Sequence, residues 1–348
     1  MSVPTTGPET LGTLSDEPIV EPDAPQGRRK RKKKGGDGAI VGKSPLQIAW
    51  GRLRRDKIAV VCGAVALFFV LVAIFADVIA KIFGVSLDTV LASTVINPIN
   101  GLPKNGPPLA GFDPAHPFGV APRNGDDNLA YWIYGCRTSL IIATLATVFS
   151  TIVGIFMGLV AGFTGGIVDR VISFIIDLFM TIPFLLAALT LAPIINQRFA
   201  LSDHYPMIQK TTLVAVLALF GWMPLARLMR GEVLSLRERE FVQAARVLGM
   251  PVRRILLKEL LPNLVAPIVI SISLLLPGFV AAEAGLAYLG IGVTSGASWG
   301  QTINKAVPWF DNYGLYLWEP LIGIVALVLA LNLLGDAIRD ALDPKTRR

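Results

Sequence analysis

The stretch that decides the fold is EFVQAARVLGMPVRRILLKELLPN, residues 240–263, a polar and basic island between long apolar runs. Its first part predicts a short helix with one apolar face, because four residues recur at helical spacing: Phe241, Ala244, Ala245 and Leu248. Gly249 predicts the end of this helix, because glycine enters the left-handed backbone conformation without a steric penalty.

A second short helix is predicted after Pro251, a residue that suits the first turn of a helix. One face of this helix is apolar and the other is basic, with Val252, Ile255, Leu256 and Leu260 opposite Arg253, Arg254 and Lys258. Pro262 is expected to end the helix or to kink it into the next apolar run.

The composition indicates an all-α integral membrane protein. The chain has 348 residues, of which 53% are hydrophobic and 16% charged, whereas soluble domains carry about 25% charged residues. The apolar residues arrive in runs near the roughly 20 residues that span a bilayer. The net charge of +7 raises the alternative of nucleic-acid binding. Membrane topology explains it better, because most of the basic residues flank apolar runs, and no nucleic-acid partner is expected.

Six transmembrane helices are predicted, at about 58–82, 138–163, 171–194, 211–229, 264–291 and 318–338. With the N-terminus inside, 25 of the 32 Lys and Arg residues fall on the cytoplasmic side, as the positive-inside rule requires. This topology places both termini and the island at 240–263 in the cytoplasm.

The chain divides into four parts. Residues 1–43 are expected to be a disordered, basic cytoplasmic tail. Its run RRKRKKK at 28–34 is interpreted as a solvated charge run near a membrane, able to touch anionic lipid, rather than as a nuclear signal or nucleic-acid patch. Residues 44–82 combine an amphipathic helix at the membrane surface with the first span. Residues 83–136 form an extracytoplasmic segment, and 137–348 a core with five transmembrane helices.

Asp177 and Glu283 lie within apolar runs, where a charge costs at least about 2.5 kcal/mol, so each should face a cavity or a partner. Both remain open as residues of a translocation path or as packing carboxylates paired across helices. Asp336 and Asp340 flank Arg339, which favours an ion-paired helix end over acid–base chemistry.

The sequence predicts neither a catalytic site nor a metal site. His116 and His204 are the only histidines, and neither has a second ligand at metal spacing. The two cysteines, Cys62 and Cys136, are expected to be free. The sequence has no G-x-x-x-x-G-K-[ST] phosphate loop, so any use of ATP requires a separate subunit. Inside the predicted spans the sequence supplies no Ser-Lys, His-Glu or paired-Asp constellation, which disfavours an intramembrane enzyme.

The island resembles the cytoplasmic loop of ABC-importer permeases, whose pattern is E-A-A, three residues, G, nine residues and I-x-L-P. The matching positions are Gln243, Ala244, Ala245, Gly249, Glu259, Leu261 and Pro262. Gln243 and Glu259 depart from the pattern, which usually has Glu and Ile there. The resemblance implies that this loop, together with Phe241 and Leu248, lies on an ATPase subunit and passes its motion to the membrane helices.

Other segments resemble the permeases for di- and oligopeptides. They include residues 44–80, which look like the domain preceding the core in the second permease of such pairs, and 153–191, 279–300 and 332–344. Residues 116–140 resemble the same group but depart at Val120, Ala121 and Asp126, where it has Thr, Asp and Arg. If this external segment contacts a binding protein, partner or cargo preference would differ here.

The resemblance implies a type I ABC-importer permease that moves di- or oligopeptides across the cytoplasmic membrane of a prokaryote by alternating access. Its implied partners are a second permease subunit, two ABC ATPases that bind ATP and Mg, and an extracytoplasmic substrate-binding protein. No cofactor is expected in this chain. Two alternatives stay open: an importer of another small solute such as a nickel chelate, and a self-contained secondary transporter that would use Asp177 and Glu283 for ion coupling. The second lacks any sign of inverted repeats.

Overall fold

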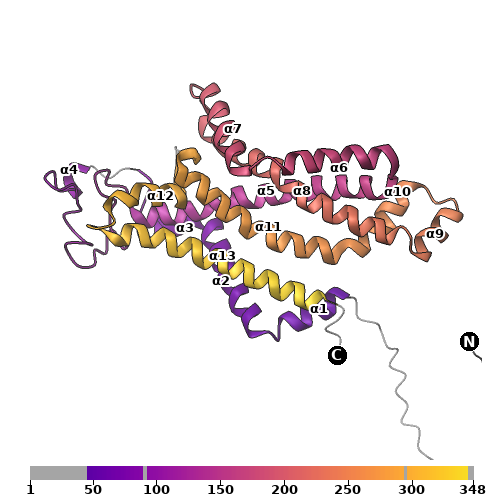
Figure 1. The fold of residues 1–348 in the computed structure, drawn as a ribbon. Helices are drawn as coiled ribbons and strands as arrows, with labels where there is room; N and C mark the ends of the chain where they lie inside the picture. Colours follow the sequence, from indigo (N-terminus) through magenta and orange to yellow (C-terminus); the bar gives the residue numbers. More distant parts are fainter. Residues whose placement is uncertain (1–44, 89–91, 294–295, 344–348) are drawn as a thin grey trace, which may run out of the picture. The chain divides into compact units, whose positions relative to one another are not determined.

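The computed structural model describes residues 45–88, 92–293 and 296–343 (Figure 1). The tail predicted to be disordered at 1–43, with its basic run, lies outside the described residues. Within the described ranges the regular structure is helical, and the extended pairing is limited to two isolated bridges, Ile96 with Pro103 and Val120 with Asp127. The predicted all-α fold is therefore confirmed.

The α-helices follow one another as α1 Pro45–Leu53, α2 Lys57–Ile74, α3 Ala76–Phe83, α4 Ala92–Val95, α5 Asn128–Thr164, α6 Gly166–Met180, α7 Phe184–Arg198, α8 Tyr205–Leu236, α9 Glu240–Val247, α10 Val252–Arg254, α11 Val265–Leu286, α12 Trp299–Ala306 and α13 Gly314–Leu342. Single turns of π- or 3₁₀-helix connect some of them, at Ile255–Leu260, Leu261–Leu264, Ala287–Ile291 and Val307–Trp309.

Among the residues that the structure describes, five helical runs are long and apolar enough to cross a membrane, namely α2, α5, α8, Val252–Ile291 and α13. The predicted third span, 171–194, is not one straight helix, because α6 and α7 meet at 85°. The bend falls at Pro183, which has no N–H to donate and keeps the residue before it out of the helical conformation. The bundle has six spans if this bent pair counts as one.

The second short helix of the island is also not a separate element. From Val252 the chain stays helical through a π turn and a 3₁₀ turn into α11, as one run that ends at Ile291. The π turn at Ile255–Leu260 widens the helix just before Pro262, which gives the proline ring room. Pro262 therefore marks a change in hydrogen-bond pattern within a continuous span.

Helices α5 and α8 pack closely because α5 presents a row of glycines. A Cβ built on Gly154 would lie 2.9 Å from the Trp222 carbonyl oxygen, and one on Gly162 would lie 2.8 Å from the Val233 Cβ. At Gly158, between them, a Cβ would come even closer to the Met229 side chain. Small residues four apart let membrane helices approach to backbone contact, so this row fixes the pairing of α5 with α8.

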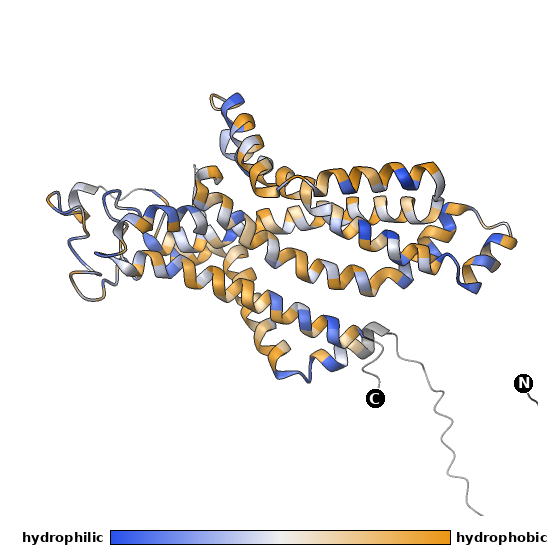
Figure 2. Cartoon of the chain, in the orientation of Figure 1, coloured by the Kyte–Doolittle hydropathy of each residue, from blue (hydrophilic) through white to orange (hydrophobic). Residues whose placement is uncertain are grey.

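The long helices are hydrophobic along their lengths, as Figure 2 shows, including faces that this single chain leaves exposed. Apolar side chains such as Ile152, Phe156 and Phe174 are more than half exposed there. Such faces are suited to contact with the lipid bilayer or with a partner membrane protein.

A helix lies at the start of residues 44–82, where an amphipathic helix is predicted, and it is α1. Trp50 is exposed, and the Arg54 guanidinium lies 5.0 Å from the centroid of its ring. The Arg52 guanidinium donates to the Ala341 carbonyl at 3.4 Å, which ties α1 to the end of α13. This leaves the indole of Trp50 free to meet a membrane interface.

Candidate functional site

Helix α9 forms the first half of the island, as predicted. It ends at Val247, and the chain turns at Gly249, whose φ of +73° is left-handed. The Met250 N–H closes this turn on the Ala245 carbonyl at 3.0 Å. The Gln243 side-chain amide donates to the Arg237 carbonyl at 3.0 Å. Gln243 therefore fixes the turn that joins α8 to α9.

The apolar residues of α9 divide between an anchored side and an open side. Val242 and Ala245 are buried, whereas Leu248 is 82% and Val247 87% exposed. Of the four residues predicted to share one apolar face, Ala245 is the one that is buried. At about 100° per residue it lies about 40° from Phe241, on the border between the two sides. Phe241, Ala244 and Leu248 remain exposed, as a docking face requires.

The anchored side of α9 rests on a hydrophobic cluster built from three other helices. It consists of Leu159 of α5, of Leu225, Met229 and Val233 of α8, and of Ile255, Leu260 and Leu264 in the run that leads into α11. The Arg246 guanidinium also lies 4.7 Å from the centroid of the Phe163 ring at the end of α5. A displacement of α9 is therefore felt by α5, α8 and α11 together.

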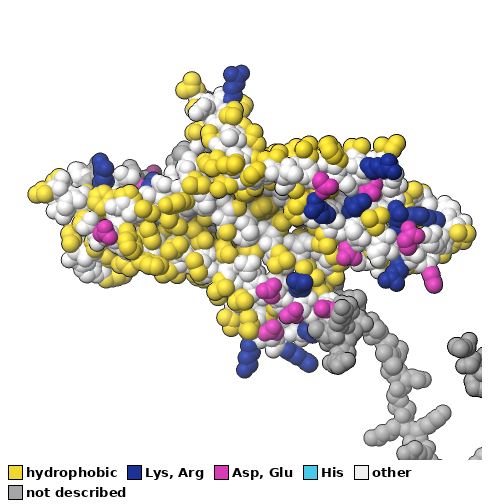
Figure 3. All heavy atoms as spheres, in the orientation of Figure 1, with side chains coloured by type: hydrophobic (Ala, Val, Ile, Leu, Met, Phe, Trp, Pro, Cys, Tyr) yellow, Lys and Arg dark blue, Asp and Glu magenta, His cyan; other side chains and the backbone are white. Residues whose placement is uncertain are grey.

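Glu259, Leu261 and Pro262, the other residues predicted for coupling, lie on the helical run beneath α9. Glu259 and Leu261 are half-buried and Pro262 is exposed. The Glu259 carbonyl accepts a hydrogen bond from the Asn263 amide at 2.6 Å. The predicted set is thus divided between α9 and the start of the α11 span. Figure 3 shows Lys and Arg side chains gathered around this end of the molecule.

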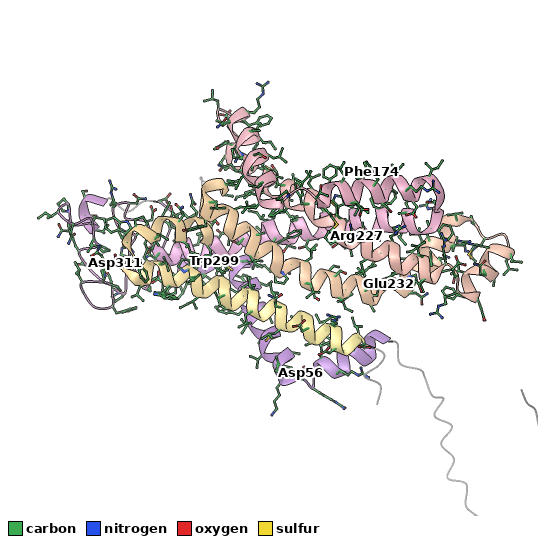
Figure 4. All side chains as sticks on the ribbon, in the orientation of Figure 1. Asp56, Phe174, Arg227, Glu232, Trp299 and Asp311 are labelled. Atoms are coloured by element: carbon green, nitrogen blue, oxygen red, sulfur yellow. The ribbon has the colours of Figure 1, made fainter. Side chains whose placement is uncertain are left out.

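Two ion pairs join α6 to α8. The Asp169 carboxylate binds the Arg230 guanidinium through two bonds, one of them 2.8 Å long. Further along the same helices, Asp177 pairs with Arg227 at 2.5 Å. Arg227, labelled on α8 in Figure 4, was not predicted as a site residue. Its only signal in the sequence is an arginine one turn before Arg230.

Glu283 has quite different surroundings. Its side chain is fully buried, and one carboxylate oxygen accepts a hydrogen bond from the Ser298 hydroxyl at 2.9 Å. The other oxygen has no hydrogen-bond partner among the residues described. Ser139 of α5 lies against the same carboxyl. Glu283 thus joins α11 to the start of α12, where Trp299 is also buried (Figure 4).

The opposite end of the bundle carries a polar cap. The Asp127 carboxylate accepts the Ala130 N–H at 2.8 Å and contacts His116 Nδ1 at 2.6 Å. This cap starts α5 at Asn128, ten residues before the predicted second span. The Tyr313 hydroxyl donates to the Phe118 carbonyl at 3.2 Å, and burial raises the pKa of this phenol, so it keeps its proton.

The three residues that depart from the family pattern, Val120, Ala121 and Asp126, lie in the interior of this cap. Val120 and Ala121 are each 2% exposed, and Asp126 is buried 3.7 Å from the Lys305 ammonium. These residues thus support the packing of the cap, and their side chains offer little surface to a partner.

Within the described ranges no cluster of three His, Cys, Asp or Glu side chains has the geometry of a metal site.

Residues 154–348 match a family described as the binding-protein-dependent transport system inner membrane component. Residues 44–88 match the N-terminal TM domain of oligopeptide transport permease C. The dipeptide transport system permease protein DppC of Bacillus subtilis (strain 168) is 31% identical, over 88% of this chain and 87% of that protein. The oligopeptide transport system permease protein OppC of the same strain is 30% identical, over 90% and 95%.

Among solved structures, an inward-facing form of the MetNI methionine ABC transporter aligns with a TM-score of 0.48 and 20% identity, over 62% of this chain and 97% of that chain. The family resemblance predicted from the sequence is confirmed by the sequence relatives. Because the first family covers more than half of the chain, and relatives of at least 30% identity extend over most of it, the chain belongs to the binding-protein-dependent transport system inner membrane components.

Proposed function

We propose that this chain is the transmembrane permease subunit of an ATP-driven ABC importer and moves di- or oligopeptides by alternating access. The peptide cargo is supported by the relatives, which are named as dipeptide and oligopeptide permeases and match most of this chain. An importer of another small solute, such as a nickel chelate, has no comparable support among those relatives.

One observation carries the coupling role. Helix α9 turns Phe241 and Leu248 outward while Val242 and Ala245 hold it against the bundle. An exposed apolar face on an anchored helix suits a groove on a partner, as in other helix-in-groove contacts. We assign that groove to an ABC ATPase, so that α9 acts as a lever on the membrane helices. The left-handed turn at Gly249 sets the angle between α9 and α10.

The remaining partners follow from the same assignment. Two ATPases bind ATP and Mg²⁺ beneath the α9 end, which the positive-inside rule assigns to the cytoplasm, as it does both termini. A second permease subunit covers part of the exposed apolar faces, and lipid covers the rest. A substrate-binding protein docks on the capped end, which faces outward from the cytoplasmic membrane.

The test is a mild-detergent purification of the tagged chain from its native membrane, with mass spectrometry of what accompanies it. We expect two ATPases and a second permease. Leu248→Asp should lose the ATPases but keep the second permease, because a charge would be buried in the groove. The matched control is Ile99→Asp, since Ile99 is an exposed apolar residue at the capped end.

Two results would contradict the proposal. If the chain purifies alone, the ABC subunit assignment fails, and a self-contained secondary transporter becomes the better explanation. If Leu248→Asp retains the ATPases as well as Ile99→Asp does, the complex stands but α9 is not its docking helix. Peptide uptake by the reconstituted complex then tests the cargo.

A further inference from the structure

The Asp177–Arg227 pair is exposed on the flank of an otherwise apolar helix. The two side chains are 65% and 53% exposed, and α6 around Asp177 reads SFIIDLFM. The neighbouring pair, Asp169 with Arg230, is much less exposed, at 15% and 33%. Charges within a membrane helix are too costly to face lipid, so they face water or another protein.

The face of α8 that carries Arg227 contains further features that suit water better than lipid. Phe220, Pro224, Arg227 and Gly231 follow one another four, three and four residues apart, which aligns them along one side of the helix. Pro224 has no N–H to donate to the Phe220 carbonyl. A Cβ built on Gly231 would meet open space. This side of α8, on which Arg227 is the charged residue of the four, is called the Arg227 face.

An apolar cavity lies at the Phe220 end of the Arg227 face. It has a volume of about 270 Å³, and its lining includes Phe184 at the start of α7, Phe220 of α8, and Leu274 and Gly278 of α11. Seven residues separate Phe220 from Arg227, which is about 10 Å along a helix. An apolar pocket and a pair of opposite charges thus lie about 10 Å apart on one side of α8.

A short peptide with free ends has the matching chemistry. It carries an ammonium group, a carboxylate and apolar side chains, and a dipeptide is about 7 Å long when extended. A guanidinium binds a carboxylate through two parallel hydrogen bonds, which makes arginine selective for that group. If the peptide inserts between the two side chains, one ion pair is replaced by two, and no charge is left without a partner.

We infer that Arg227 and Asp177 lie on the transport path and recognise the two ends of a peptide. Arg227 binds the terminal carboxylate, Asp177 binds the terminal ammonium, and the cavity next to Phe220 receives an apolar side chain. This inference rests on the proposed function and specifies the site at which the permease itself selects its cargo. Glu283, which is fully buried beside Ser298, takes no part in it.

The first test measures uptake by the whole complex, with its binding protein, in proteoliposomes. Alanyl-phenylalanine is compared with its C-terminal amide and its N-acetyl derivative. The uptake ratio of free to amidated peptide should fall about tenfold in Arg227→Gln, because that variant no longer distinguishes a charged carboxylate. Asp177→Asn should lower the ratio of free to acetylated peptide in the same way. The binding protein is identical throughout, so a change in either ratio belongs to the permease.

The matched control is the less exposed pair. Asp169→Asn and Arg230→Gln remove the same charges from the same two helices, and we expect a lower yield of folded protein but unchanged ratios. An unchanged ratio in Arg227→Gln would overturn the inference while leaving peptide transport intact. A wild-type complex that moves no peptide would instead overturn the proposed function, so the two failures are distinguishable.

The second test measures access by water. Arg227→Cys, in a background with Cys62 and Cys136 replaced by alanine, should react with a membrane-impermeant thiol reagent in the assembled complex. The buried control Met229→Cys should react at least about tenfold more slowly. If Arg227→Cys reacts no faster than the control, the pair is sealed within a subunit interface and the inference is wrong.

Discussion

The guanidinium of Arg246 lies 4.7 Å from the centroid of the Phe163 ring, which connects α9 to the last turn of α5. Val242 and Ala245 of α9 pack at the same time against residues of α8 and of the α11 span. Helix α9 is thus attached to three membrane helices through one polar and several apolar contacts. A force on α9 therefore moves together the ends of those helices that pack against it.

The Arg246–Phe163 contact should contribute to coupling. Arg246→Gln removes the cation over the ring, a contact of about 0.5–1 kcal/mol at a partly exposed site. We expect roughly a two- to fivefold fall in peptide-stimulated ATP hydrolysis by the complex, with membrane insertion unchanged. Arg253→Gln is the control, since Arg253 is an exposed arginine of neighbouring α10.

A double substitution tests whether the two residues act together. If Phe163→Leu in the Arg246→Gln background causes no further loss, the pair works as one contact. Losses that multiply would mean that each residue acts independently, and the link between α9 and α5 would then lie elsewhere in the hydrophobic cluster.

The turn at Gly249 should tolerate only residues that accept a left-handed backbone. A β-branched residue at φ +73° carries a strain of at least about 1–2 kcal/mol, which changes the angle between α9 and α10. We expect Gly249→Val to insert into the membrane normally and to lose most peptide uptake. Gly249→Asn is the control, because asparagine enters this conformation more readily. Normal uptake by Gly249→Val would argue against α9 as a lever.

Local signals in the sequence predict the parts of the site that depend on neighbouring residues. The helix from Glu240 and its stop at Gly249 follow from apolar spacing and from glycine's freedom at positive φ. Spacing places Ala245 on the same apolar face as Phe241 but does not say where the bundle lies. The α5 and α8 cluster beneath α9 decides that Val242 and Ala245 point inward.

Features that depend on the register of distant helices were not predictable in the same way. Pro183 and Pro262 both fall within helical segments, where a proline can kink or end the helix. Only Pro183 accompanies a sharp bend, because a π turn before Pro262 accommodates the second proline. Asp177 stood out as a charge in an apolar run. Its partner Arg227 is 50 residues away, and the two meet only because α6 packs beside α8.

The glycine row of α5 should be intolerant of even one added methyl group. In Gly158→Ala the new Cβ would overlap the Met229 side chain and lie 2.8 Å from the Ala226 carbonyl oxygen. Overpacking of this kind costs about 1–3 kcal/mol, so we expect a lower thermal unfolding midpoint in detergent. Gly63→Ala is the matched control, because its Cβ would meet only the end of Leu334 at 4.0 Å. Equal midpoints for the two variants would show that α5 and α8 are not held by this row.

Substitutions of Glu283 separate its two possible roles. Glu283→Gln keeps an oxygen to accept from the Ser298 hydroxyl, and its amide group can donate toward Ser139, whose buried hydroxyl has no hydrogen-bond partner among the described residues. Glu283→Leu leaves the buried Ser298 hydroxyl without its acceptor, at a cost of about 1–3 kcal/mol. A packing carboxylate therefore predicts normal stability and uptake for Glu283→Gln. For Glu283→Leu it predicts a lower unfolding midpoint, with normal uptake per folded complex.

Loss of uptake in Glu283→Gln at unchanged stability would instead make the charge itself part of transport. Glu283 would then rejoin Asp177 as a residue of the path.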